Sequence, residues 1–295
     1  MAATLLKGTA YITGGASGIG KATAFGLARH GIKRLALTDI SQENLLATSE
    51  ALKSQYADVE IESLQLDVCD VKAVDDSITQ AVKRFGRIDV AVNVAGISGA
   101  GKATDATEES DWTSVLDVNL NGVWRSQRAQ VRAMMKQECV EIPLNELGWK
   151  PQGIGEYMVM EELTLYDGRN LGIREGRGSI INVASMYGLI ASPVYIPATP
   201  YTSSKHGVIG LTRSDAITYA PHGIRINAIC PGYVRTPLLQ VATERGSMDP
   251  EIAKTPMGRL AEVEEIADAI AFMASPMASF MAGSALLVDG GYSAN

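Results

Sequence analysis

This chain of 295 residues is short of several features that mark particular protein classes. It has three cysteines, Cys69, Cys139 and Cys230, far apart and without a CxxC pair, so we expect reduced thiols and no disulfide framework. Basic residues are fewer than acidic ones, 26 against 33, which argues against nucleic acid or an anionic membrane as a partner. No apolar run is long enough to span a membrane and no signal-like segment opens the chain, so we expect a cytoplasmic protein.

What the chain does have is an alternation of short apolar runs with segments of helical periodicity, the pattern of βαβ units. A hydrophobic content of 46% is enough for a large core. Strands are expected over 9–13, 34–39, 61–67, 88–94, 179–184, 224–229 and 285–288, and helices over 18–30, 42–55, 71–85, 111–137, 201–220 and 263–274. We therefore predict an α/β fold: a single doubly wound (Rossmann) domain over 1–295, with a seven-stranded parallel sheet and helices on both faces.

Two segments depart from that alternation. Residues 138–178 are too many for a helix-to-strand connection, which usually takes about two to six residues, so we expect an irregular insertion. This insertion could include a hairpin around Asp167-Gly168, and it is either a surface excursion or a contact with another subunit. The insertion follows the carboxyl end of a helix and precedes the start of a strand, so we expect it at the edge of the sheet opposite the one where ligands bind. Residues 236–256 are expected to form a mobile substrate lid.

A glycine-rich turn follows the first predicted strand, with Gly14, Gly18 and Gly20 in the segment TGGASGIG. Glycines permit a tight turn and close approach of the backbone to a pyrophosphate. The helix that begins there offers free N–H groups and the positive end of its dipole. Because Asp39 ends the next strand, nineteen residues after Gly20, the arrangement predicts a dinucleotide site.

The carboxylate of Asp39 decides the expected cofactor. It would accept hydrogen bonds from the adenosine ribose and repel a 2′-phosphate, which favours NAD over NADP. Two alternatives stay open: Asp39 could cap the helix that begins near Ser41, and the nearby cations Lys21, Lys33 and Arg34 could attract a phosphate.

Two further strand ends complete this half of the predicted site. Asp67-Val68 ends the third strand, where a carboxylate can bond the adenine amino group. Asn93-Val94-Ala95-Gly96 ends the fourth, where small residues let the backbone lie against a ribose.

Tyr201 and Lys205 are four residues apart and share one face of the helix predicted over 201–220. An ammonium and a bound oxidised nicotinamide can lower the pKa of a tyrosine from about 10 toward working pH. A tyrosine that exchanges a proton beside a hydride carrier suits redox chemistry between alcohols and carbonyls. The pair alone is a weak signal, because so short a motif recurs by chance, and the ordered motifs upstream give it weight.

Together these motifs resemble the short-chain dehydrogenase/reductase superfamily, in its form with a TGxxxGxG turn and a YxxxK site. The resemblance covers the chain apart from 138–178. It rests on TGGASGIG, Asp67-Val68, NVAG at 93–96, Asn119 in VNLNG, Ser185, Tyr201 with Lys205, and Pro231-Gly232.

The resemblance implies a role for each matching residue. Tyr201 would be the general acid/base and Ser185 would hold the substrate oxygen. Lys205 would bind the nicotinamide ribose and lower the tyrosine pKa, and Asn119 would hold a water that links Lys205 to solvent. Pro231, Gly232, Val234 and Thr236 would line the nicotinamide. Chemistry agrees, since a hydroxyl pair can stabilise the charge that develops on a carbonyl oxygen while one of them supplies the proton.

The full set of expected cofactor contacts is Gly14, Ser17, Gly18, Ile19, Gly20, Asp39, Ile40, Asp67, Val68, Asn93, Ala95, Gly96, Tyr201, Lys205, Pro231, Gly232, Val234 and Thr236. No metal site is expected.

The chain departs from the family pattern at three places. Val94 stands where a second Asn is usual, which removes one bracing side chain. The gap from Ser185 to Tyr201 is longer than is usual, which leaves Ser203 and Ser204 as poor competitors for the role of Ser185. The third departure is the insertion at 138–178.

We therefore expect an NAD(H)-dependent oxidoreductase that interconverts a secondary alcohol and a ketone. The pocket would be walled by 98–102, 186–195, Tyr233 and 236–256. Apolar residues of the last segment (Leu238, Leu239, Val241 and Met248) favour a small, apolar, cyclic or aromatic-sized substrate, unless they pack on a core of their own. The alternatives are an NADPH-dependent carbonyl reductase of a biosynthetic pathway and, more remotely, a non-catalytic dinucleotide-sensing scaffold.

The helices predicted over 111–137 and 201–220 carry small and apolar residues that the sheet cannot wholly cover. In the resembling family such helices pair between subunits, so we expect a homo-oligomer, a tetramer or a dimer. The substrate, the physiological direction and the stereochemistry cannot be inferred from the sequence.

Overall fold

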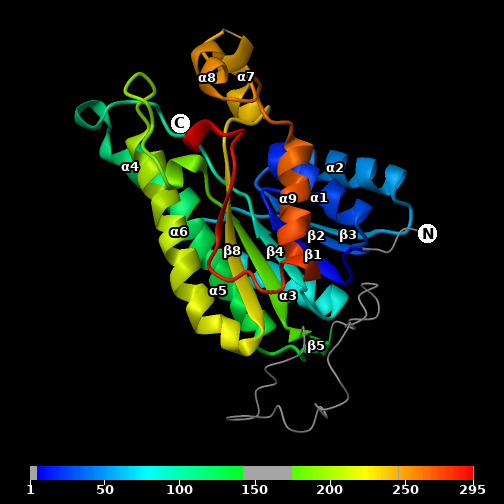
Figure 1. Cartoon of the computed structure of the whole chain (residues 1–295). Helices are drawn as coiled ribbons and strands as arrows, with labels where there is room; N and C mark the ends of the chain where they lie inside the picture. The colour runs from blue at the N-terminus through cyan, green and yellow to red at the C-terminus, as the bar shows by residue number, and fades with distance from the viewer. Residues whose placement is uncertain (1–4, 142–174, 245, 295) are drawn as a thin grey trace, which may run out of the picture.

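The computed structural model describes residues 5–141, 175–244 and 246–294 (Figure 1). Its central sheet has seven strands in the order β3-β2-β1-β4-β7-β8-β9, and every neighbouring pair is parallel. The strands are β1 Thr9–Thr13, β2 Arg34–Asp39, β3 Glu60–Gln65, β4 Val90–Asn93, β7 Gly178–Val183, β8 Ile224–Pro231 and β9 Ala285–Val288. The predicted seven-stranded doubly wound sheet is confirmed. The strand order reverses between β1 and β4, where ligands bind in such folds.

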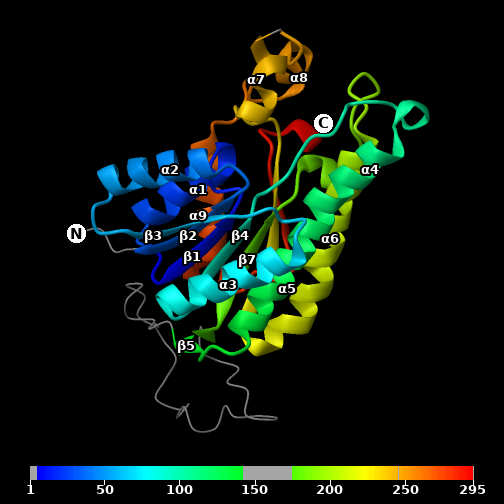
Figure 2. The same ribbon diagram turned by 180° about the vertical axis from the view of Figure 1, so that it is seen from behind.

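Helices cover both faces of this sheet, as Figures 1 and 2 show from opposite sides. One face is covered by α1 Gly18–Arg29, α2 Gln42–Gln55 and α9 Val263–Ala274, and the other by α3 Val71–Phe85, α5 Gly122–Met134 and α6 Thr199–Tyr219. Strand alternation divides the core between them, since Ile12 packs with the first set and its neighbour Tyr11 with the second. Both side chains are fully buried.

Local signals in the sequence explain where the helices begin and end. The Asp70 carboxylate accepts from the backbone N–H groups of Lys72 and Ala73 at the start of α3, and Gly86, with a φ of 85°, ends that helix. At the start of α9, Glu262 and Glu265 form a reciprocal capping box.

The helix predicted over 111–137 is interrupted. It consists of α4 Glu109–Leu116, a π-helical turn over Asp117–Asn121, and α5. A π-turn inserts an extra residue per turn and commonly marks a functional site. Asn119 lies in this turn and is completely buried.

The described ends of the predicted insertion and the segment 236–256 lie at opposite ends of the sheet. At the lower end in Figure 1, β5 Val140–Glu141 pairs antiparallel with β6 Glu175–Gly176. The hairpin expected around Asp167-Gly168 falls outside the described residues. At the upper end, beyond the carboxyl ends of the strands, the segment 236–256 contains α7 Pro237–Glu244 and α8 Asp249–Lys254.

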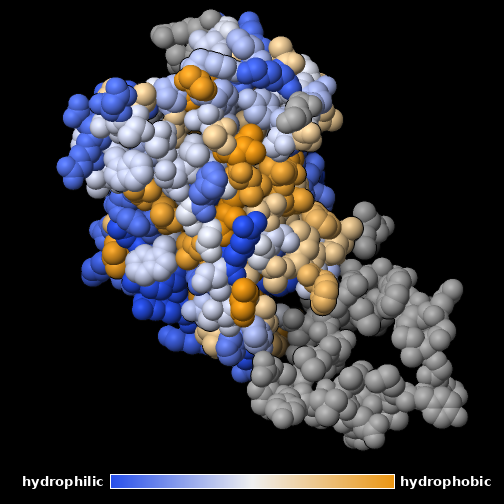
Figure 3. Space-filling view, turned by 60° about the vertical axis from the view of Figure 1, so that its left-hand side comes forward, coloured by the Kyte–Doolittle hydropathy of each residue, from blue (hydrophilic) through white to orange (hydrophobic). Residues whose placement is uncertain are grey.

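Part of the surface is apolar, as the orange area in Figure 3 shows. The exposed large apolar side chains include Met277 and Phe280, which precede the edge strand β9, and Ile217 on α6. The segment that contains Met277 and Phe280 continues through Gly283, which lies beside α6. A Cβ added at Gly283 would be 3.5 Å from the Cβ of Ala216. Within the described residues, no helix combines the length and apolarity needed to cross a bilayer.

Candidate active site

Three of the predicted catalytic residues converge where β7 ends and α6 begins. Ser185 follows β7 and caps a short 3₁₀ turn, Met186–Gly188, by accepting from the N–H of Tyr187 at 3.1 Å. Tyr201 lies in the first turn of α6, which begins with Thr199 and Pro200. Hydrogen bonding between Ser185 and Tyr201 contributes to the pKa of the phenol. The serine and the tyrosine are therefore in contact despite the long gap between them in sequence.

Lys205 lies one turn further along α6 and is buried. Its Nζ donates to the carbonyl oxygen of Val183 at 2.8 Å and is 5.5 Å from the centre of the Tyr201 ring. Burial disfavours the charged ammonium and lowers the pKa of Lys205 to about 8. This lysine therefore loses its charge at a lower pH than an exposed lysine does.

The expected lowering of the tyrosine pKa is not found in the protein by itself. Burial raises the pKa of Tyr201, and the hydrogen bond with Ser185 opposes that rise only in part. Burial is the largest cause because it disfavours the charged phenolate. The prediction that Lys205 and a bound oxidised nicotinamide together lower this pKa concerns the protein with its cofactor and stays a prediction.

Asn119 connects the π-turn to the segment after β4. Its Oδ1 accepts from the N–H of Ile97 at 2.8 Å, and its Nδ2 donates to the carbonyl oxygen of the same residue at 2.8 Å. A Cβ added at Gly96 would lie 3.1 Å from Asn119 Oδ1 and 3.7 Å from Lys205 Nζ. Asn119 and Lys205, which are expected to serve one proton path, thus both lie close to Gly96.

Of the two alternative serines, Ser204 is committed elsewhere. The hydroxyl of Ser204 donates to the carbonyl oxygen of Tyr201 at 2.7 Å and accepts from Asn119 Nδ2 at 3.2 Å. It is completely buried within α6. Ser185 is the serine whose hydroxyl is hydrogen-bonded with the Tyr201 phenol.

The glycine turn has the form that a pyrophosphate requires. Gly14 has a φ of 67°, and a Cβ there would be 2.8 Å from the backbone nitrogen of Ala95. Among the described residues, no side chain caps the amino end of α1 at Ser17. The N–H groups of its first turn, which includes Ile19, are left to face a ligand, so these residues fit a dinucleotide.

Asp39 lies beside this turn at the end of β2. One carboxylate oxygen accepts from the N–H of Ala16 at 3.1 Å and the other from the N–H of Ser41 at 3.0 Å. The cap of α2 is Ser41, whose hydroxyl accepts from Asn44 N at 3.3 Å. Asp39 therefore braces the approach to α2 without capping it, and each oxygen keeps a lone pair for a ribose hydroxyl. The next residue, Ile40, is 65% exposed.

The ends of β3 and β4 carry the remaining predicted cofactor contacts on this side of the site. The Asp67 carboxylate accepts from the N–H of Cys69 at 2.9 Å, and Val68 is buried. Thr13 Oγ1 braces the end of β4 by accepting from Val94 N at 3.2 Å and Ala95 N at 3.4 Å.

The side chain of Asn93 points away from the predicted cofactor site. It exchanges hydrogen bonds with Gln130 at 2.8 and 3.1 Å and donates to Asn182 at 2.9 Å. Asn182 in turn donates to Gln127 and Thr212. Sequence reasoning missed this buried polar network, although polar residues on the inner face of α5 were a signal for it.

The segment after β8 passes over the site. Pro231 ends the strand, and a Cβ at Gly232 would be 2.8 Å from the Cα of Asp289. Val234 is buried. Thr236 lies at the glycine turn, because a Cβ at Gly18 would be 3.4 Å from its Cγ2.

The apolar residues expected to face a substrate are not alike. Leu238 is exposed, whereas Met248 is buried, so Met248 follows the alternative in which these residues pack on a core of their own. The side chain of Val241 lies outside the described part of the chain. A completely buried carboxylate, Glu251 of α8, was also missed, although it is surrounded by tyrosines of the predicted pocket wall.

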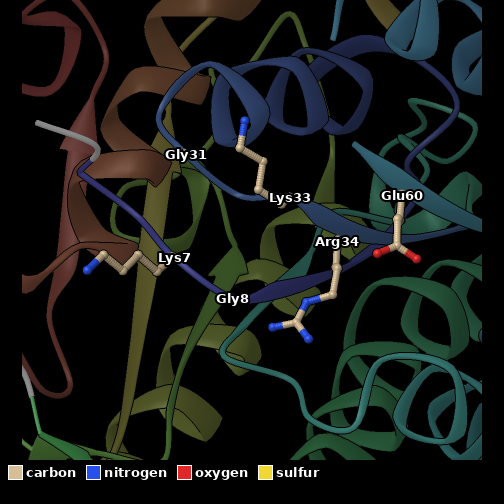
Figure 4. A pocket seen from close by; sticks show the side chains of 6 residues that line it. All are labelled: Lys7, Gly8, Gly31, Lys33, Arg34 and Glu60. Carbon is tan, nitrogen blue, oxygen red and sulfur yellow. The ribbon is translucent and has the colours of Figure 1, made fainter. Parts of the chain in front are cut away.

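A separate hollow lies at the far end of the sheet. Figure 4 shows its lining residues, Lys7, Gly8, Gly31, Lys33, Arg34 and Glu60, at the amino ends of the first three strands. Its cations have other contacts: Lys33 pairs with Asp58, and Arg34 Nη1 donates to the carbonyl oxygen of Phe85 at 3.1 Å. Because Ser185 follows the carboxyl end of β7, this hollow belongs to the opposite end of the sheet.

A glycine turn at the amino end of a helix, with a serine, a tyrosine and a lysine at the same edge of a parallel sheet, defines a nucleotide-dependent oxidoreductase. Two family models match the sequence: "short chain dehydrogenase" over residues 8–142 and "Enoyl-(Acyl carrier protein) reductase" over residues 169–293. The chain belongs to the short-chain dehydrogenase/reductase family, and it is an NAD(P)-dependent enzyme acting on CH–OH and C=O groups.

Individual relatives match over nearly the whole chain. A short-chain dehydrogenase of Penicillium roqueforti is 38% identical, with 97% of this chain and 96% of the relative covered. A cyclohexanol dehydrogenase of Acinetobacter sp. is 34% identical, with 96% and 94% covered.

Solved structures agree with this membership. Levodione reductase superposes with a TM-score of 0.80 at 33% identity, with 97% of this chain and 98% of the other covered. A variant of actinorhodin polyketide ketoreductase, solved with NADPH, gives a TM-score of 0.77 at 29% identity, with 97% of each chain covered.

Proposed function

We propose that this protein is an NAD(H)-dependent oxidoreductase that interconverts a secondary alcohol and a ketone. The proposed substrate is small, largely apolar and cyclic. The observation that carries the proposal is the convergence of Ser185, Tyr201, Lys205 and Asn119 beside the glycine turn.

In this proposal Tyr201 is the general acid/base. During reduction its phenol donates a proton to the substrate oxygen, and during oxidation it takes the proton back. The hydroxyl of Ser185 donates a hydrogen bond to the same oxygen and holds it within reach of the phenol. Lys205, anchored on the carbonyl oxygen of Val183, presents its ammonium behind the tyrosine ring. When bound, the nicotinamide supplies or accepts the hydride and, when oxidised, brings a positive charge to the site.

The proposed preference for NAD rests on Asp39. Its carboxylate is held by two backbone N–H groups next to the glycine turn, so its negative charge stays where the adenosine ribose is expected. A 2′-phosphate at that position would be repelled.

An NADPH-dependent biosynthetic reductase is the second candidate. The observation in its favour is the likeness to a polyketide ketoreductase solved with NADPH. Asp39 argues against it.

The proposed substrate class rests on the wall around Ser185. Tyr187 and Tyr233 meet edge to face, with ring centres 6.2 Å apart, and Tyr187 lies near the catalytic hydroxyls. Aromatic walls of this kind suit a compact apolar ring. A relative named for the oxidation of cyclohexanol is consistent with such a substrate.

We also propose that the protein is a homo-oligomer, a dimer or a tetramer. Support comes from large apolar side chains left exposed on its helices and beside its edge strand, among them Trp124 of α5, Ile217 of α6 and Phe280.

The test of the proposed chemistry is a Tyr201→Phe variant assayed with a panel of cyclic secondary alcohols and ketones. Loss of the proton donor should lower turnover by a factor of about 100 or more, while fluorescence titration should show that the variant still binds NADH. In the wild type, NADH should bind more tightly than NADPH. A Tyr201→Phe variant with full turnover would remove this tyrosine from the chemistry and favour a non-catalytic role.

A further inference from the structure

Glu251 is a completely buried carboxylate that the chemistry above does not use. It lies in α8 and accepts four hydrogen bonds. Its Oε2 accepts from the phenols of Tyr233, at 2.9 Å, and Tyr292. Its Oε1 accepts from the phenol of Tyr195 and from Lys254 Nζ, the latter at 3.2 Å. A buried carboxylate is costly unless its lone pairs are satisfied, so α8 is held where these donors meet.

The donors come from segments far apart in sequence. Tyr195 belongs to the predicted pocket wall at 186–195, Tyr233 follows β8, and Tyr292 begins the last turn of the chain. Glu251 thus ties the α7–α8 segment to three other parts of the molecule. The carboxyl end of α8 is packed on the tail as well, since a Cβ at Gly290 would be 2.8 Å from the Cγ2 of Thr255.

A further hydrogen bond links this cluster, through Tyr233, to Tyr187 near the catalytic residues. Each phenol has one proton, and that of Tyr233 is given to Glu251. The phenols of Tyr233 and Tyr187 are also hydrogen-bonded, so Tyr187 must be the donor of that bond. The carboxylate therefore sets the orientation of the Tyr187 hydroxyl through Tyr233.

Tyr187 is in direct contact with the proposed catalytic serine. Its backbone N–H donates to Ser185 Oγ at 3.1 Å. The pKa of the Tyr187 phenol is raised, chiefly by burial and then by the charge of Glu251. Tyr201 contributes a smaller electrostatic effect in the same direction, so the two tyrosines lie near each other. A continuous chain of contacts runs from Glu251 through Tyr233 and Tyr187 to Ser185.

We propose that Glu251 is a positioning residue: it seats the α7–α8 segment over the active site and, through Tyr233 and Tyr187, orients the catalytic serine. The seating of the segment follows from the contacts alone. The catalytic consequence rests on the function proposed above.

Hydrogen–deuterium exchange tests the seating without any substrate. Glu251→Gln keeps the volume of the side chain but replaces one accepting oxygen by a donor. We expect amide exchange in residues 237–254 to accelerate by about tenfold or more, the effect of losing a hydrogen bond to a charged group. Exchange in β1 and β4 should stay unchanged. The matched control is Glu244→Gln, the same change at an exposed position of α7. Equal exchange in the two variants would overturn the proposal.

Steady-state kinetics tests the connection to Ser185. Tyr195→Phe removes a donor to Glu251 that lies outside the path to Tyr187, so it should raise KM for the substrate and lower kcat less than Tyr233→Phe does. Tyr233→Phe breaks the path to Tyr187, so it should lower kcat by about tenfold. The same KM and kcat changes in both variants would refute the positioning of Ser185. A wild type inactive on every alcohol and ketone would count against the proposed function, and the exchange measurement would still decide the role of Glu251.

Discussion

The buried ammonium of Lys205 allows a quantitative test, in which Lys205→Met replaces it by an apolar side chain of similar length. In the fold, burial lowers the pKa of Lys205 from 10.5 to about 8. Between these pH values the unfolded chain binds more protons at this lysine than the folded chain does. The free energy of unfolding of the wild type therefore gains a contribution that grows as pH rises through 8 and is complete above 10.5.

The size of this contribution follows from the two pKa values. One pH unit of displacement is worth about 1.4 kcal/mol, so the full range corresponds to about 3 kcal/mol. Integration from pH 7 to pH 9, with a folded pKa of about 8, gives about 1.4 kcal/mol. The Met variant lacks this gain. Shifted groups such as Cys230, whose pKa burial raises to about 11, titrate in both proteins and largely cancel in the comparison.

The assay is urea unfolding of both proteins at pH 7 and pH 9. The rise in unfolding free energy from pH 7 to pH 9 should be about 1.4 kcal/mol larger for the wild type than for the variant. An equal rise in both proteins, or a larger one in the variant, would show that burial does not hold the pKa of Lys205 down.

Two other substitutions test the cofactor half of the site. Asp39→Arg exchanges the charge that repels a 2′-phosphate for one that attracts it, so the ratio of NADH to NADPH affinity should fall by about tenfold or more in fluorescence titrations; an unchanged ratio would remove Asp39 from the choice of cofactor. Gly14→Ala forces a Cβ to within 2.8 Å of the Ala95 nitrogen at a φ of 67°, and it should lower stability by about 1–3 kcal/mol and weaken NADH binding. Gly210→Ala is the control, because nothing lies within 4 Å of its added Cβ on the exposed face of α6. This change should leave the stability unchanged or raise it by up to about 1 kcal/mol. An equal loss of stability at both positions would refute the steric argument.

Much of the architecture could be predicted from the sequence because its signals are local. The bounds of β1, β2, α2, α3 and α9 agree with the predicted ranges. Each is marked by apolar periodicity and by a cap or turn residue at its ends, such as Asp70 before α3 and Gly86 after it. The helix at 111–137 shows where this fails. Its apolar spacing continues across Asp117–Asn121, and a π-turn changes that spacing too little to be recognised.

The candidate site was predictable to the extent that its residues follow ordered motifs. Gly14, Ser185, Tyr201 and Lys205 all lie at one edge of the sheet, because the carboxyl ends of parallel strands and the helix starts that follow them share that edge. Asn93 was placed correctly along the chain, but its side chain turns into a buried amide network. That orientation depends on Gln130 and Asn182, which are distant in sequence.

The sequence by itself thus determined the fold class, the family and the edge of the sheet that carries the chemistry, since strand pattern, glycine spacing and motif order are written along the chain. The protonation behaviour of Tyr201 and Lys205 and the role of Glu251 were decided only by the tertiary structure. A pKa depends on how completely a group is removed from water. A buried carboxylate depends on which donors surround it, and the tyrosines around Glu251 come from three separate segments. Neither desolvation nor such a convergence of distant side chains has a counterpart in local sequence spacing.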